Sequence, residues 1–222
     1  MPALPPPPLL EEHTYHIFNR GNNGETLFLS EYDYWRFIDK YYQYCHQAME
    51  TFAYCLMRNH FHLLVRIRSA DEQQGVFEML RHNMQEKWSP FKVRCPSMQL
   101  SHLCNSHAQS VNKRYKRTGN LFERPFKRVP VVDSDYFLTA LCYIHWNPER
   151  HRAVQDFRLY PYSSYQNFYR TEDNWVNTVE VLDRFGGIER FRESHNRIEL
   201  LWDPGEGMET ADYYPIDTLS GS

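Results

Sequence analysis

The chain has 222 residues, of which 41% are hydrophobic and 16% aromatic, which excludes a disordered chain and allows a sizeable core. No apolar run approaches the ~20 residues of a membrane-spanning helix, the proline-rich start lacks the regions of a secretory signal, and five scattered cysteines favour reduced thiols. We therefore expect a cytoplasmic protein without a membrane partner. The net charge of −3 by itself argues against a nucleic-acid partner, but the charges are unevenly distributed along the chain, as described below.

The first third of the chain predicts a strand, a helix and a hairpin. The segment TYHIFNRGNN alternates apolar side chains and breaks at Gly21, which favours a strand followed by a turn. Ser30 is a suitable helix N-cap, and aromatic and apolar residues then recur at helical spacing to about Met49. Residues 52–57 and 60–68 predict two short strands joined by a tight turn.

The middle of the chain predicts further helices around one more strand. GVFEMLRHNMQEKW favours a helix, and so, less regularly, does HAQSVNKRYKR. Residues 126–132 predict a strand, and DSDYFLTALCYIHW predicts a helix that stops before Pro148. The resulting β-α-β-β-α-β order predicts an α+β fold, a ferredoxin-like sandwich whose antiparallel sheet carries helices on one face and leaves the other face free.

The domain organisation follows from composition. We divide the chain into a proline-rich lead-in (1–13), one folded domain (14–170) and an acidic, partly helical C-terminal extension (171–222), in which WVNTVEVLDRFGGIERFRESH favours one or two short helices. The extension carries 12 acidic and 4 basic residues, so the rest of the chain is basic. NKRYKRTGNLFERPFKR (112–128) has seven Lys or Arg, one Glu and interleaved aromatic residues, which suits phosphates and unpaired bases or a solvated basic face.

Two histidines, His60 and His62, interrupt a run that otherwise reads as a buried strand, CLMRNHFHLLVRI. Residues two apart share one face of a strand, so the apolar residues between and after them pack on one side while the histidines share the other with Arg66 and Arg68. Neutral imidazole is a common ligand of divalent ions, so the pair is compatible with a metal site. Two ordinary hydrogen-bonded histidines are the alternative.

A second group of metal-binding residue types lies in CPSMQLSHLCNSH. Its spacings match none of the usual zinc patterns, so we interpret the segment as a plain loop. The residues concerned are Cys95, His102, Cys104 and His107.

The segment YIHWNP places Tyr143 and Asn147 four residues apart, and therefore on one helical face. At this point the chain resembles the REP-associated tyrosine transposases, relatives of the transposases of the smallest single-strand insertion sequences. The resemblance rests on YHIFNRGN, CLMRNHFHLLV, RTGNLFERPFKRVPV, YIHWNPERHRAV and YPYSSYQNF, in this order. Arg58 replaces a proline that the family usually has before its histidine motif.

The resemblance implies an HUH nuclease, named for two histidines that flank a hydrophobic residue. In this chain His60 and His62 match the metal pair, with Mg²⁺ or Mn²⁺ as the expected ion. Tyr143 matches the nucleophile, which would form a covalent 5′-phosphotyrosine with single-stranded DNA. Asn147 matches the helix position that completes the metal shell or orients the nucleophile.

The resemblance also implies a partner, namely single-stranded DNA with REP-like palindromic hairpins. Relatives include monomers and homodimers that exchange the tyrosine helix, so both states remain open. The residues expected to contact DNA are those of the basic segment and the end of the first strand: Asn19, Arg20, Lys113, Arg114, Lys116, Arg117, Arg124, Lys127 and Arg128.

Two other functions remain as alternatives. One is another HUH nuclease, a relaxase or replication initiator, although such chains commonly carry further catalytic or helicase regions. The other is a non-catalytic module that binds single-stranded nucleic acid on its sheet, which would need neither Tyr143 nor Asn147 opposite the histidines.

Overall fold

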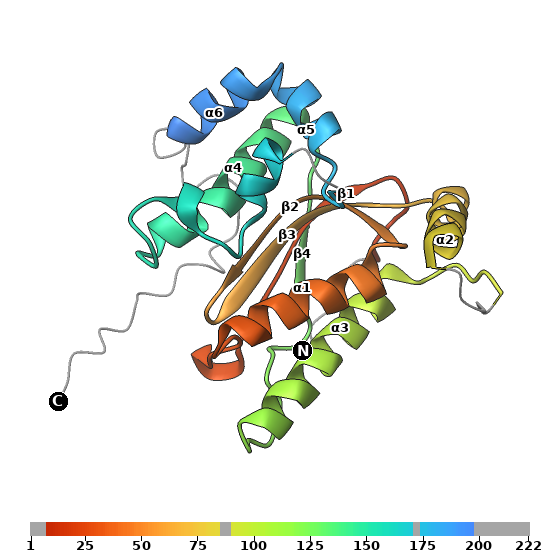
Figure 1. Cartoon of the computed structure of the whole chain (residues 1–222), viewed down its shortest axis with the longest axis vertical. Coiled ribbons are helices and arrows are strands. Elements are labelled where there is room, and N and C mark those ends of the chain that lie inside the picture. The colour runs from red at the N-terminus through yellow and green to blue at the C-terminus, as the bar shows by residue number, and fades with distance from the viewer. Residues whose placement is uncertain (1–7, 85–89, 171–173, 198–222) are drawn as a thin grey trace, which may run out of the picture.

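The computed structural model describes residues 8–84, 90–170 and 174–197, and centres on one antiparallel sheet of order β2-β3-β1-β4. The strands are β1 (Thr14–Arg20), β2 (Met49–Met57), β3 (His60–Ile67) and β4 (Lys127–Pro130). The helices are α1 (Glu31–Cys45), α2 (Ala70–Met84), α3 (Pro96–Arg114), α4 (Ser134–Arg150), α5 (Thr178–Phe185) and α6 (Ile188–Asn196). Short 3₁₀ turns are η1 (Asn22–Gly24), η2 (Phe157–Leu159) and η3 (Ser164–Tyr169). The predicted α+β, ferredoxin-like arrangement is confirmed (Figure 1).

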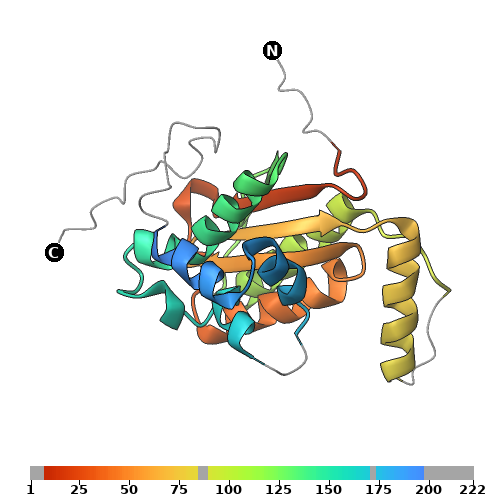
Figure 2. The same ribbon diagram turned by 90° about the horizontal axis from the view of Figure 1, so that it is seen from above.

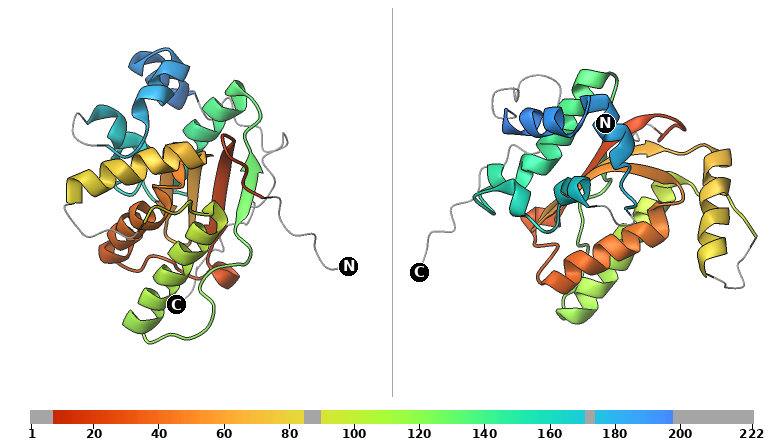
Figure 3. Two further views of the ribbon diagram at one scale, coloured as in Figure 1. Left: turned by 90° about the vertical axis from the view of Figure 1, so that its right-hand side faces the viewer. Right: turned by 45° about the horizontal axis from the view of Figure 1, so that its top comes forward.

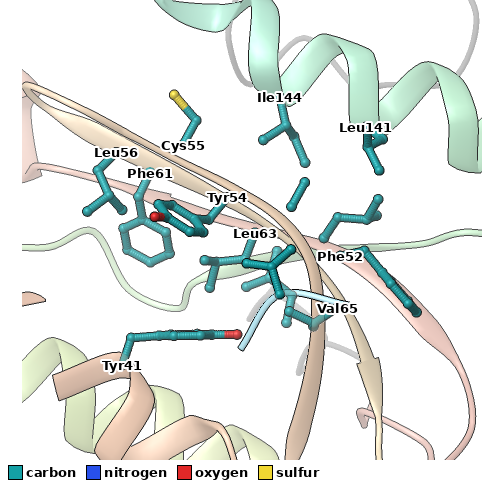
Figure 4. Packing of buried hydrophobic residues seen from close by; sticks show 14 of the residues in the cluster. Tyr41, Phe52, Tyr54, Cys55, Leu56, Phe61, Leu63, Val65, Leu141 and Ile144 are labelled. Atoms are coloured by element: carbon teal, nitrogen blue, oxygen red, sulfur yellow. The ribbon is translucent and has the colours of Figure 1, made fainter. Parts of the chain in front are cut away.

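The face of the sheet toward α1 and α3, called the lower face from its place in Figure 1, carries the aromatic core. Phe61, Leu63 and Val65 of β3 are buried and point toward α1, as the strand alternation predicted (Figure 4). Phe61 lies 5.2 Å from the ring of Phe37 on α1, and Tyr41 of the same helix hydrogen-bonds Thr51 in β2 at 2.7 Å. This packing fixes the register of β3, because a shift by one residue would turn the histidines into the core.

The upper face is not free, contrary to the prediction. Helix α4 packs across β2 and β3 (Figure 3), with Leu141 and Ile144 directed at the sheet (Figure 4). Phe52 of β2 lies 5.1 Å from Phe137 of α4. The sheet therefore lies between α1 and α3 on one side and α4 on the other, and His62, expected on a wet face, is fully buried.

Two predicted helix ends are wrong. Helix α1 begins after Ser30 but ends at Cys45 rather than near Met49, because Met49 starts β2 and pairs with Ile67 of β3. Helix α4 does not stop before Pro148 but continues to Arg150. A proline in the last turn removes one backbone donor, and helical bonding resumes beyond it, since the amide of His151 donates to the carbonyl of Asn147 at 2.9 Å.

The chain between β3 and β4 forms two helices, which overlap the two segments predicted as helical, whereas the predicted β-α-β-β-α-β order counted only one. Helix α2 projects beside the sheet (Figure 2), and α3 packs against α1. The CPSMQLSHLCNSH segment is the first part of α3, so its interpretation as a loop is wrong. The end of GVFEMLRHNMQEKW, residues 85–88, lies outside the described residues.

The C-terminal extension contributes α5 and α6, which pack against α4 (Figure 1). The chain enters them along the sheet, where the amide of Asn177 donates to the carbonyl of Thr51 at 2.8 Å and Trp175 stacks on Tyr54. In the described part of the chain no helix combines the length and apolarity needed to cross a bilayer. The acidic residues 198–222 lie outside the described part.

Candidate active site

The histidine pair stands at the start of β3, directly after the two-residue turn from β2. His62 is fully buried and His60 is half-buried, and their ring centroids lie 5.2 Å apart. The Nδ1 atom of each ring is held: His60 Nδ1 lies 2.8 Å from Asn59 Oδ1, and His62 Nδ1 lies 2.9 Å from His16 Nε2. A contact at Nδ1 fixes the orientation of each ring, so that its second nitrogen, Nε2, points away from that contact and can serve as a ligand.

Helix α4 presents a stripe of polar side chains to these histidines. The ring centroid of Tyr143 lies 5.7 Å from that of His62. One turn further, Asn147 Oδ1 lies 3.5 Å from His60 Nε2, and the ring of His151 lies 5.1 Å from that of His60. The structure thus brings together the four residues that the sequence singled out, from a strand and a helix that are about 80 residues apart in the chain.

Tyr143 is enclosed, with 1% of its surface exposed. Its hydroxyl accepts a hydrogen bond from Arg150 Nη1 at 3.0 Å, and the guanidinium carbon of Arg150 lies 5.3 Å from the ring centroid. Asn147 is also buried, and its amide donates to the carbonyl of Tyr143 at 3.2 Å, which leaves the amide oxygen directed at His60. A cation at the phenol oxygen favours any negative charge that develops there.

The donor atoms present fit a divalent ion. His60 Nε2, His62 Nε2 and Asn147 Oδ1 are two imidazole nitrogens and one amide oxygen, and three such ligands would leave coordination positions for phosphate and water. Among the described residues, no group of three or more His, Cys, Asp or Glu side chains is arranged to hold a metal ion. In the segment considered for zinc, His107 Nε2 donates to the carbonyl of Leu27 at 2.8 Å, a structural bond inside the core.

Two of the basic residues expected at DNA lie at this site. Arg20 and Lys127 line a small pocket together with both histidines and Phe18. Lys127 is exposed, with its amino group 6.0 Å from the Phe18 ring. Arg20 forms an ion pair with Glu123, whose carboxylate reduces the positive charge available to a phosphate.

Other members of the basic set are dispersed. Arg114, at the end of α3, lies over the ring of Tyr32 at 4.3 Å, and Arg117 pairs with Glu25. Arg128 points to the opposite face of the sheet from Lys127, where Nη1 donates to Ser97 Oγ at 3.3 Å. The exposed members of the set are Lys113, Arg114, Lys116, Arg124 and Lys127.

Asn19 lines the same pocket, but it pairs with Phe61 in the register of β1 and β3, so its side chain lies on the opposite face of the sheet from the histidines. Its amide donates to the carbonyl of Glu123 at 3.3 Å and its oxygen accepts from the amide of Arg20 at 2.9 Å, so it shapes the end of β1. Of the basic segment, Lys127 lines the pocket with the histidines, and the remaining cations do not form one continuous track to the site.

Sequence reasoning missed three neighbours of the site: His16, Arg150 and His151. The alternation of β1 places His16 on the face opposite Tyr15 and Ile17, and this local signal was present in TYHIF. Arg150 and His151 follow Tyr143 by seven and eight residues, the spacing of two helical turns, but the expected helix end before Pro148 concealed them.

Comparison with known proteins identifies similar proteins in sequence and in fold. No family model matches the chain. It is 24% identical over 152 residues, 65% of this chain and 77% of the relative, to a Haemophilus influenzae protein named "Putative REP-associated tyrosine transposase". In fold it is similar, with a TM-score of 0.54 and 13% identity over 76% of this chain and 86% of the other, to a REP-associated tyrosine transposase solved in complex with a REP hairpin. The resemblance to the REP-associated tyrosine transposases that the motifs indicated is confirmed by a relative in sequence and a neighbour in fold.

Proposed function

We propose that this protein is a metal-dependent single-stranded DNA nuclease and strand transferase of the transposase type, with Tyr143 as its nucleophile. The observation that carries the proposal is the stripe on α4: the Tyr143 ring lies 5.7 Å from that of His62, and Asn147 Oδ1 lies 3.5 Å from His60 Nε2. A protein that only binds nucleic acid on its sheet would not need a tyrosine enclosed with an arginine beside two oriented histidines.

The reaction that these residues support is a transesterification. The phenol oxygen of Tyr143 attacks the phosphorus of a DNA phosphodiester, its proton passes to water, and the 3′ oxygen leaves and is protonated by water. The product is a 5′-phosphotyrosine, which a strand with a free 3′-OH can reverse without an external energy source. Arg150 donates to the attacking oxygen and stabilises its developing negative charge.

His60, His62 and Asn147 are the residues that would hold the divalent ion, Mg²⁺ or Mn²⁺. When bound, such an ion would polarise the non-bridging phosphate oxygens and offset the additional charge of the transition state. His16 and Asn59 keep the two imidazoles oriented for this role through their contacts with Nδ1.

The substrate is single-stranded DNA beside a hairpin. Tyr143 is enclosed, with 1% of the residue exposed, so a phosphodiester would have to enter this narrow site as part of a separated, flexible strand, because a base-paired duplex is wider and stiffer. The solved neighbour in fold is bound to a REP hairpin. Lys127 and the exposed cations at the end of α3 supply phosphate contacts on the approach to the site. We propose the cytoplasm as the location of the reaction, because its substrate is DNA.

The test is a covalent adduct. Wild-type protein is incubated with labelled hairpin DNA that carries single-stranded arms, with Mg²⁺ or Mn²⁺, and separated on a denaturing gel. We expect an adduct that Tyr143→Phe abolishes and excess EDTA prevents, while hairpin affinity persists. Tyr115→Phe is the matched control, because the Tyr115 hydroxyl donates to Asp33 at 2.7 Å, remote from the histidines, and its loss should leave the adduct intact. An adduct formed by Tyr143→Phe would assign the nucleophile elsewhere.

A further inference from the structure

A second group of buried polar side chains lies beside the candidate active site and takes no part in the proposed reaction. It consists of His145 on α4, His195 on α6 and Ser164 in η3, none more than 1% exposed. His145 Nδ1 lies 2.9 Å from His195 Nε2, and His145 Nε2 lies 2.8 Å from Ser164 Oγ. Burying two imidazoles in an aromatic core is costly unless their nitrogens are hydrogen-bonded, so this arrangement requires an explanation.

The two ends of the group determine the position of every proton. At one end, His195 Nδ1 lies 2.7 Å from the carbonyl of Phe191, which only accepts, so Nδ1 carries the hydrogen. Burial lowers the pKa of His195 to about 3, and no acidic side chain takes part in this group of three residues, so both rings are neutral. His195 Nε2 is then an acceptor, and His145 must donate to it from Nδ1.

The same reasoning continues to the sheet. His145 Nε2 is left as an acceptor, so it receives the hydroxyl hydrogen of Ser164. The oxygen of Ser164 in turn accepts from the backbone amide of Tyr54 in β2 at 2.8 Å. The result is one continuous chain of hydrogen bonds, all in the same direction, from β2 through η3 and α4 to the last turn of α6.

This chain of hydrogen bonds crosses α4 at His145, the residue midway between Tyr143 and Asn147. Two residues of α-helix correspond to about 200° of rotation, so His145 lies on the opposite flank from both. The end of the hydrogen-bond chain at β2 also lies next to the site, because Tyr54 is followed by Cys55, which pairs with His62 across β2 and β3. The backbone of Ser163 forms a bridge with Cys55, which holds η3 on the outer edge of β2.

We propose that His145 and His195 are positioning residues that hold the tyrosine helix in one rotation and height above the histidine strand, so that the C-terminal extension is part of the catalytic apparatus. This rests on the proposed function. A fully bonded polar chain has one geometry, whereas apolar contacts alone permit several, and small displacements of a nucleophile reduce the rate strongly. The extension therefore acts through α4 without contacting the reacting atoms.

The test separates positioning from simple stabilisation. His195→Leu leaves the Nδ1–H of His145 without an acceptor and should lower Tm. The double variant His145→Leu/His195→Leu removes both imidazoles, and Ser164 can then donate to the carbonyl of Tyr54, which lies 3.3 Å away. We expect the double variant to regain much of the Tm, to bind the hairpin within about twofold of wild type, and to form the adduct at least tenfold more slowly at saturating DNA.

Val181→Ala is the matched control. Val181 is fully buried on α5, so the substitution loosens the extension without touching the hydrogen-bond chain, and its adduct rate should stay within about twofold of wild type. A wild-type rate in the double variant, or an equal loss of rate in Val181→Ala, would overturn the proposal.

Two measurements are independent of activity. Nitrogen-15 spectra of the imidazoles should show both His145 and His195 as Nδ1–H tautomers. An Nε2–H tautomer at either residue would contradict the proposed chain of hydrogen bonds. Amide hydrogen exchange in α4 should accelerate in the double variant and not in Val181→Ala. If wild-type protein forms no adduct, the proposed function fails, whereas these measurements still decide whether the histidines hold α4.

Discussion

Arg150 Nη1 lies 3.0 Å from the hydroxyl of Tyr143, and the two residues are seven positions apart on α4. The contact joins the reacting atom of the proposed nucleophile to a permanent cation inside a largely closed site. Because Asn147 lies on the same stripe and faces His60, one helix supplies the proposed nucleophile, the cation beside it and one side of the proposed metal site.

The first prediction concerns this cation. Arg150→Gln should lower the rate of adduct formation by roughly 100-fold, since losing one donor at a developing oxyanion costs about that much in other enzymes. Hairpin affinity should change little. Arg152→Gln is the matched control, because Arg152 is exposed just beyond the end of the same helix. Equal losses of rate in both variants would show that Arg150 attracts DNA rather than assists Tyr143.

The second prediction concerns His16, whose Nε2 lies 2.9 Å from His62 Nδ1. Removing such an outer partner typically weakens metal binding by about 10- to 100-fold, because the ligand ring loses its orientation. His16→Ala should therefore raise the Mn²⁺ dissociation constant by this factor, measured by calorimetry, and shift the metal dependence of adduct formation in parallel. His13→Ala, an exposed histidine in the same part of the chain, serves as control. Unchanged Mn²⁺ affinity in His16→Ala would place the ion elsewhere.

The chain's local patterns were sufficient to predict which residues face one another within each element. His60 and His62 share a face because strands have a period of two, and Tyr143 and Asn147 do so because helical neighbours are four apart. Together with the motif resemblance, these spacings predicted the antiparallel sheet and the four central residues of the site.

What the sequence could not predict depends on contacts between distant segments. His16 meets His62 only because β1 pairs with β3 in one register. Met49 reads as helix by its spacing but joins β2, since pairing with Ile67 and burial outweigh local propensity. The cover over the upper face follows from α4, α5 and α6 packing together, which no local period encodes.

The third prediction concerns acid stability. Burial lowers the pKa of His107 to about 4, whereas a histidine in the unfolded chain titrates near 6.5. The unfolded state therefore binds the proton more readily between these values, and acidification favours unfolding. The stabilisation is fully present above about pH 6.5 and is lost as the pH falls toward 4, by up to about 3 kcal/mol for this residue.

The measurement is urea unfolding at several pH values. His107→Gln keeps a donor for the carbonyl of Leu27 but cannot be protonated, so its stability should fall less steeply than that of wild type between pH 6.5 and 4. Parallel curves for the two proteins would mean that His107 does not contribute to the acid sensitivity.

The last prediction concerns how DNA is held. The exposed side chains of Arg114 and Lys116 lie at the end of α3, where phosphates can reach them, whereas Arg117 is paired with Glu25 and its replacement would disturb the fold as well. We expect a hairpin with a single-stranded arm to bind more tightly than a blunt duplex or an unstructured strand of equal length. Equal affinity for the three shapes would contradict hairpin recognition.

Replacing Arg114 and Lys116 by Gln should weaken binding of every DNA sequence alike, because phosphate contacts carry no base information. The slope of log affinity against log salt should decrease by about 1 for each phosphate that the variant no longer neutralises. Arg190→Gln, which replaces an exposed arginine on α6, is the control for a change of charge elsewhere on the surface. The three DNA shapes are titrated at several salt concentrations with each variant. If the slope of the Arg114 and Lys116 variant matches that of wild type and Arg190→Gln does not, the phosphates bind the C-terminal extension instead of α3.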